Sequence, residues 1–241
     1  MSSRYGMIMF KERKLPGQVN RRKDRLMNNM TKKERQNQQL MAMLPPAQER
    51  LRKYTPEEIC RKAGVCFDPE LQELFFESLG KTIHIHIPEY TIQPPLDMWH
   101  TLTLLQYLDT ADGTEPEGSW ISLSEMPGGL ARGDGFNRDI ETMFARYFSN
   151  TTKEAFAEAA RSLNARIIPS KADISAVFPY APRFLVLLNF WEADEEFPSS
   201  GKALVKAGAE HYLTIEAAGG ACSAVVQAVR DALLSFNAET L

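Results

Sequence analysis

Four carboxylates occupy five consecutive positions in the segment Glu192-Ala193-Asp194-Glu195-Glu196. Carboxylates this close repel one another, so they must face water, pair with basic side chains or coordinate a cation. A histidine follows further along the chain, in Glu210-His211-Tyr212. Acids with one nearby histidine can form a carboxylate-rich metal site or an acid–base pair. The candidate metal ligands are Asp194, Glu195, Glu196 and His211, and the alternative interpretation is a solvated acidic turn.

A second segment, 118–129, offers groups that can contact a small molecule. Ser122 and Glu125 have the spacing of a capping box, which predicts a short helix just after Ser122. The Pro-Gly-Gly that follows predicts a tight turn, where paired glycines let a ligand approach the main chain. Aromatic side chains near both segments would supply the apolar walls of a pocket. We therefore expect one site that joins the two segments and His211, with these candidate cofactor-binding residues: Trp120, Gly128, Gly129, Trp191 and Tyr212.

Two further histidines lie in the alternating run Lys81-Thr82-Ile83-His84-Ile85-His86. Alternation of apolar and polar residues is typical of a half-buried strand, with the isoleucines on one face and the histidines on the other. Histidines at this spacing can share a metal ion, and the alternative is that they simply form the solvent face of the strand.

The order of the expected elements predicts an α+β fold. Apolar spacing and capping residues predict helices at 31–43 (stopped by Pro45-Pro46), 56–63, 96–108, 136–148, 152–163 and 218–236, with a flexible stretch at 132–135. Strands are expected at 166–168, 173–180, 183–191 and 202–205. The run 183–191 is apolar on both faces, which is typical of a central strand. The fold is thus an N-terminal helical half, followed by a mostly antiparallel sheet packed by helices that include a C-terminal helix.

Charge is distributed unevenly along the chain. Residues 1–53 hold 14 basic and four acidic side chains, whereas the remainder holds 14 basic and 27 acidic ones. We expect a basic N-terminal extension, 1–45, partly helical or disordered, and a single α+β domain at 46–241. The extension could contact a protein partner or an acidic surface. It has few aromatic residues and no helix-turn-helix or zinc-finger spacing, which disfavours nucleic acid. Met30 is a second candidate start of translation.

Several classes of protein are excluded by composition. The three cysteines form no Cys-x-x-Cys pair, which excludes a disulfide scaffold and a four-cysteine zinc or iron–sulfur site. No apolar run approaches the ~20 residues of a membrane span, and the charged N-terminus does not resemble a secretory signal. We therefore expect a cytoplasmic protein.

Three strings carry a resemblance to a known family: GSWISLSEMPGG, FWEADEEFPSSGKAL and EHYL. In matching order, over about residues 50–238, the chain resembles the domain-of-unknown-function family 3786, found in bacteria and archaea and mostly in anaerobes. The resemblance implies no established activity and no catalytic residue. Some members are joined to a four-cysteine iron–sulfur module, which this sequence does not contain. Neighbouring genes of the family suggest corrinoid or one-carbon metabolism.

Three functions remain open at this point. The first is an accessory protein of anaerobic metabolism that binds a small molecule, a divalent metal or a corrinoid, with His211 as an axial imidazole. The second is a metal-dependent enzyme that uses the acidic loop and His211. The third is a protein-interaction module with a basic arm. No nucleophile elbow or His-Glu-x-x-His motif favours the enzyme.

Overall fold

The computed structural model describes residues 32–116 and 118–239, and its contacts divide the chain into two units, Met1–Met41 and Ala42–Leu241. The predicted start at Met30 and most of the predicted extension lie outside the described residues. The first helix, α2 (Lys32–Leu51), continues through Pro45 and Pro46, so the expected stop at these prolines is wrong. The two prolines cannot donate hydrogen bonds to the carbonyls four residues earlier, those of Met41 and Ala42. The unit boundary falls between these two residues.

Two antiparallel sheets and seven further helical elements follow in the described residues, which confirms the α+β class. The first sheet has the order β1 (Cys66–Asp68), β2 (Glu73–Ser78), β3 (Lys81–His86), β4 (Thr91–Gln93), and the second has the order β5 (Trp120–Ile121), β9 (Ser200–Lys206), β8 (Phe184–Trp191), β7 (Ile174–Ala181), β6 (Arg166–Ile168). The helical elements are α3 (Pro56–Ala63), α4 (Met98–Thr110), η1 (Leu123–Glu125), α5 (Gly129–Tyr147), α6 (Lys153–Ser162), η2 (Ala209–His211) and α7 (Ile215–Glu239). No helix within the described residues is long and apolar enough to span a membrane.

The first sheet lies in the half of the chain for which the sequence predicts mainly helices. Its alternation is as expected, because Ile83 and Ile85 are fully buried while the histidines lie on the opposite face. The histidines there meet a carboxylate from the neighbouring strand. Nδ1 of His84 lies 2.7 Å, and Nδ1 of His86 3.4 Å, from the buried carboxylate of Glu73. The carboxylate thus occupies the position between the rings.

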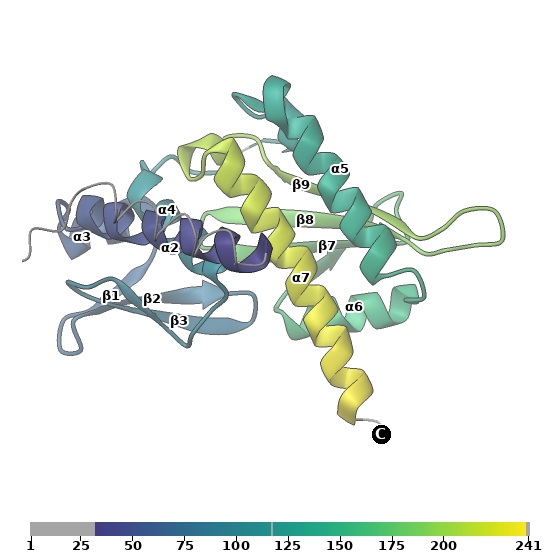
Figure 1. Cartoon of the computed structure of the whole chain (residues 1–241), viewed down its shortest axis with the longest axis horizontal. Helices are drawn as coiled ribbons and strands as arrows, with labels where there is room; N and C mark the ends of the chain where they lie inside the picture. Colours follow the sequence, from purple (N-terminus) through teal and green to yellow (C-terminus); the bar gives the residue numbers. More distant parts are fainter. Residues whose placement is uncertain (1–31, 117, 240–241) are drawn as a thin grey trace, which may run out of the picture. The chain divides into compact units, whose positions relative to one another are not determined.

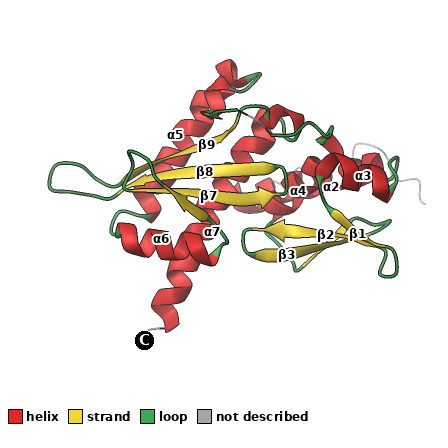
Figure 2. Ribbon diagram, turned by 180° about the vertical axis from the view of Figure 1, so that it is seen from behind, coloured by secondary structure: helices red, strands yellow, loops and turns green. Residues whose placement is uncertain are grey.

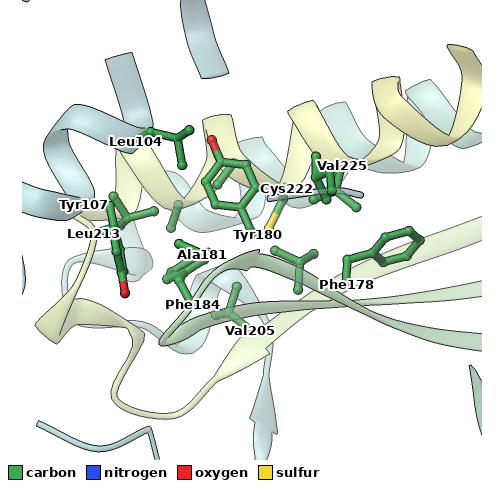
Figure 3. Close-up of a cluster of buried hydrophobic side chains, with 14 of the residues drawn as sticks. Leu104, Tyr107, Phe178, Tyr180, Ala181, Phe184, Val205, Leu213, Cys222 and Val225 are labelled. Carbon is green, nitrogen blue, oxygen red and sulfur yellow. The ribbon is translucent and has the colours of Figure 1, made fainter. Parts of the chain in front are cut away.

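The second sheet has its core on one face only. Val186, Leu188 and Phe190 of β8 are fully buried against the helices. On the opposite face of β8, Leu185, Asn189 and Trp191 are partly exposed, and Leu187 is buried. The helices α4, α5 and α6 all pack against α7, and α7 crosses β7 and β8 (Figure 1). Figure 3 shows this core, with the sulfur of Cys222 on α7 among side chains of β7, β8 and β9. Near the far end of β8, the Phe190 and Phe156 rings stack with their centroids 4.5 Å apart.

Close packing of η1 on α5 explains why α5 begins at Gly129, seven residues before the predicted start. The short helix η1 forms with the predicted Ser122–Glu125 capping box. A Cβ atom at Gly129 would lie 2.3 Å from the carbonyl oxygen of Leu123, and one at Gly133 would lie 2.3 Å from Cα of Ser124. The glycines therefore form a helix surface on which η1 rests directly, and the expectation of a flexible stretch at 132–135 is wrong.

We predict opposite effects for alanine at two glycines of α5. Gly133→Ala should lower the free energy of unfolding by about 1–3 kcal/mol, because its methyl group overlaps the η1 backbone. Gly135→Ala should leave stability unchanged or raise it by up to about 1 kcal/mol, because a Cβ atom there meets nothing within 4 Å and alanine favours helix. Urea denaturation of both variants checks the prediction. Equal effects would contradict the described packing.

A buried histidine lies where β2, α4 and β7 meet. The Ser78 hydroxyl donates to the carbonyl of Tyr180 (2.6 Å), so Nε2 of His100, 3.0 Å from Ser78 Oγ, must act as the donor to that oxygen. The phenol of Tyr180 is hydrogen-bonded to Thr103 of α4. Burial lowers the pKa of His100 to about 4, against an opposing effect of Asp97 and with a smaller lowering effect of Lys81.

Stability should therefore fall as the pH drops from about 6.5 to about 4. In this window the unfolded chain binds a proton at His100 and the folded protein does not. The expected loss between pH 7 and pH 5 is about 2 kcal/mol from this group. Urea denaturation at both pH values, compared with His100→Gln, measures it, with the exposed His86→Gln as control. If His100→Gln keeps the full pH dependence of the unaltered protein, this assignment is wrong.

Candidate functional site

The acidic loop, 192–198, connects β8 to β9, and several of its polar groups have structural partners. The Glu192 carboxylate accepts a hydrogen bond from the first backbone N–H of α6, that of Lys153 (3.0 Å). Asp194 Oδ1 accepts from the backbone N–H groups of Glu196 (2.9 Å) and Phe197 (2.7 Å), which closes the turn. The carboxylates of Glu195 and Glu196 are exposed. Most of this loop behaves as the solvated acidic turn.

The acidic loop and His211 lie at opposite ends of β9, so the expectation that they form one site is wrong. Trp191, before the loop, pairs with Ser200 at the start of β9, whereas Trp120 pairs with Lys206 at its end. Six residue steps along β9 separate these pairs by about 20 Å. Figure 1 shows the loop projecting from the end of the sheet that is far from the start of α7, which follows His211 in the chain.

The candidate cofactor-binding residues are likewise spread over the structure. Trp120 is partly exposed beneath the ammonium of Lys206, which lies 4.4 Å from its ring centroid. Trp191 is partly exposed at the other end of the sheet, and Tyr212 is buried. Gly128 adopts the left-handed conformation (φ 80°) just before α5. The space in front of Gly129 is filled by η1, so packing accounts for this glycine.

The structure instead assembles polar groups around the loop 112–115, which we call the anchored loop. Each of its four residues is held by a side chain from elsewhere. The carboxylate of Asp112 meets Nδ1 of His211 (2.6 Å), and the carbonyl of Thr114 accepts from the Tyr212 hydroxyl. Arg183 donates to the carbonyl of Gly113 (2.9 Å) and forms an ion pair with Glu115 (2.8 Å).

The phenol of Tyr107 connects the anchored loop to the rest of the fold. Its hydroxyl donates to the carbonyl of Ala63, at the end of α3, and accepts from the backbone N–H of Arg183 (3.0 Å). Its ring stacks on that of Tyr212, with centroids 5.6 Å apart. Burial raises the pKa of both tyrosines, so both remain neutral hydrogen-bond donors at neutral pH.

The carboxylate of Asp112 determines which ring nitrogen of His211 carries the hydrogen in the neutral imidazole. The backbone N–H of Thr114 and the ring of His211 lower the pKa of Asp112 to about 2, so it is an ionised acceptor at neutral pH. Nδ1 of His211 must therefore carry the hydrogen. Nε2 of the neutral ring then presents its lone pair, and no described residue forms a hydrogen bond with it. The ring is 38% exposed.

A neighbouring carboxylate oxygen lacks a partner. Oε2 of Glu210 is buried and forms no hydrogen bond with any described residue. Buried polar atoms are normally satisfied, so this oxygen marks a place where water or a ligand group is needed. In contrast, no group of three or more His, Cys, Asp or Glu side chains in the described ranges is arranged to hold a metal ion. Asp194, Glu195 and Glu196 thus stand apart from His211.

Two grooves lie away from this cluster. The larger, of about 640 Å³, lies between α6 and the start of β7 and is lined by both signs of charge: Lys153, Glu154, Glu158, Arg161 and Asp173. The smaller, of about 240 Å³, lies beside β9, next to Ser122, Asn137 and Glu141. Neither of these two grooves is lined by His211.

Sequence reasoning missed Asp112 and Arg183. Asp112-Gly113 carries a turn signal, but nothing in the sequence pairs it with a histidine 99 residues later. Arg183 immediately precedes the central strand, β8, and resembles any polar residue at a strand end. The sequence does identify His211 and Tyr212 as candidate site residues, because they lie together in the motif Glu210-His211-Tyr212.

We predict that His211→Ala raises the pKa of Asp112 from about 2 toward its ordinary value. It should remain below 3.8, because the N–H of Thr114 still donates to the carboxylate. Carbon-13 NMR titration of the side-chain carboxyl measures this change, with His84→Ala as the control. An Asp112 titration that is identical in His211→Ala and in the unaltered protein would refute the pairing.

Comparison with known proteins agrees with the motifs. The family model described as Domain of unknown function (DUF3786) matches residues 55–228, a range that contains β1 to β9 and the anchored loop. No curated protein and no solved structure was found to match the chain. Because the family model covers well over half of the sequence, the chain belongs to the DUF3786 family.

Proposed function

We propose that this protein is an accessory binding protein that presents Nε2 of His211 to the metal of a bound cofactor. A corrinoid is the candidate that the sequence resemblance implies. The observation that carries the proposal is the hydrogen bond between Nδ1 of His211 and the ionised Asp112. Histidines that ligate metals typically donate their second ring N–H to a carboxylate in this way.

The anchored loop and the side chains that hold it would orient His211 for coordination of the cofactor's metal. Asp112 fixes the ring orientation and tautomer of His211 and increases the basicity of Nε2. Arg183, through Gly113 and Glu115, and Tyr212, through Thr114, hold the loop that carries Asp112. A side chain supported this way is preorganised, which lowers the entropic cost of ligand binding. The cofactor, when bound, would supply the redox or alkyl-transfer chemistry of its metal.

The donor set fits a metal held in a macrocycle better than a free ion. A free divalent cation needs several protein ligands, and the predicted acidic ligands lie at the other end of β9. A macrocycle supplies most of the ligands of its metal, so the single imidazole of His211 would be sufficient to hold it. The unpartnered Oε2 of Glu210, next to His211 in the chain, could accept a hydrogen bond from a polar group of the ligand.

The other two functions have less support. A metal-dependent enzyme is expected to use the acidic loop together with His211. The two lie at opposite ends of β9, so they cannot ligate one metal ion together. A module that acts through the basic arm depends mostly on residues outside the described part of the chain. Cytoplasmic location and a role in anaerobic metabolism remain parts of the proposal.

Absorbance titration with aquocobinamide tests the proposal. This corrinoid lacks its own nitrogenous lower ligand, so coordination by a protein imidazole shifts its spectrum. We expect saturable binding with a spectral shift, and loss of the shift in His211→Ala. Asp112→Asn should weaken binding by about 10–100-fold, the usual effect of removing a carboxylate partner from a ligating histidine.

His86→Ala is the matched control, since His86 is also exposed and also lies beside a carboxylate, that of Glu73. It should bind as the unaltered protein does. Circular dichroism confirms that each variant is folded. A spectrum that does not change on addition of protein, or equal shifts in the His211 and His86 variants, would reject the proposed function.

A further inference from the structure

One face of the second sheet carries none of the helices in the described part of the chain. Figure 2 shows β7 and β8 from this side, with α5 and α7 behind them. The register of the strands places fourteen residues on this surface, which we call the open face: Trp120, Arg166, Ile168, Ser175, Val177, Pro179, Leu185, Leu187, Asn189, Trp191, Ser200, Lys202, Leu204 and Lys206. The solvated face of an antiparallel sheet is usually polar, whereas β8 places Leu185, Leu187 and Trp191 on this one.

The middle of the open face is apolar and partly exposed. Val177 and Leu187 are buried by their neighbours, whereas Leu185, Leu204 and Ile168 remain partly accessible. Cross-strand pairs join these side chains, for example Leu187 with both Val177 and Leu204. Contiguous apolar surface of this kind marks interaction sites in folded proteins.

The charges of the open face are all of one sign. Its fourteen positions hold three basic side chains, Arg166, Lys202 and Lys206, and no acidic one. The opposite charge is found on the acidic loop, which projects beyond the end of the same sheet (Figures 1 and 2). The loop also carries Phe197, a large apolar side chain that is 65% exposed.

We propose that the open face is the interface of a homodimer. Two copies pack these sheets face to face with their strands antiparallel, as in aligned sheet packing. In this arrangement the acidic loop and Phe197 of each copy lie over the other copy's sheet at its Lys206 end. Apolar side chains meet in the centre and unlike charges meet at both ends.

The area of the face agrees with a dimer of moderate affinity. The five strands hold 28 residues, which at strand spacing cover a flat area of about 450 Å² in each copy. Two copies then bury about 900 Å², without the additional area of protruding side chains and of the loops. This is close to the roughly 1,000 Å² that a specific interface needs.

A single-stranded nucleic acid is the competing occupant, because tryptophans and basic side chains on a sheet can bind one. The net charge of the residues that follow the basic extension disfavours a nucleic acid. Residues 54–241 carry 14 basic and 27 acidic side chains, so their overall field repels a polyanion. A second copy brings its own acids to this face at one defined place, and the centre of the face is apolar.

Sedimentation equilibrium of the full chain over a range of concentrations tests the dimer. We expect reversible association to twice the monomer mass. Leu204→Glu and Leu185→Glu, at partly exposed positions of the open face, should each weaken it by at least about tenfold. Leu234→Glu, at an exposed leucine of α7 outside the face, should not change it. The double variant Glu195→Lys, Glu196→Lys should weaken association by adding like charge.

A second measurement needs no variant. Acetylation of Lys202 in the unaltered protein, followed by mass spectrometry, should fall as association increases, whereas acetylation of Lys81 on the first sheet should not. A monomer at all concentrations would overturn the proposal. So would a dimer that both open-face substitutions leave intact, or a monomer that binds single-stranded oligonucleotides through this face.

Discussion

The Tyr107 hydroxyl and ring form the junction on which the arrangement of the candidate site depends. One phenol joins the end of α3, the start of β8 and the segment after β9, through Ala63, Arg183 and Tyr212. Segments that are distant in the chain thereby meet at one end of the second sheet. Arg183 and Tyr212, placed in this way, hold the anchored loop, and the loop presents Asp112 to His211. The imidazole is thus oriented by a chain of contacts that begins in the core.

The sequence was sufficient for features that depend on local chemistry. The capping box of η1, the helix α3 and the buried isoleucines of β3 follow from residues close together in the chain. Features that depend on distant contacts were not predictable. The glycines of α5 indicate flexibility in isolation, and only the approach of η1 shows that they serve packing. The acidic residues are a candidate site by composition, but the length of β9 separates them from His211. No sequence pattern pairs Asp112 with His211, because the two residues are distant in the chain.

Two surfaces with different chemistry therefore lie on the second sheet. At the end where Trp120 pairs with Lys206, polar side chains converge on one imidazole, which suits a small ligand. Across the open face, apolar and basic side chains spread over several strands, which suits a macromolecule. In the proposed dimer the acidic loop of one copy lies near the Lys206 end of the other. Association and ligand binding would then affect the same region of the surface.

The central claim is that Asp112 holds His211 with the hydrogen on Nδ1 and leaves Nε2 available. Long-range proton–nitrogen correlation NMR of the imidazole, recorded above neutral pH, reports which ring nitrogen carries the hydrogen. The account predicts a protonated Nδ1 and an unprotonated Nε2 in His211, and a change of this pattern in Asp112→Asn. A His211 ring with the hydrogen on Nε2, unaffected by Asp112→Asn, would contradict it.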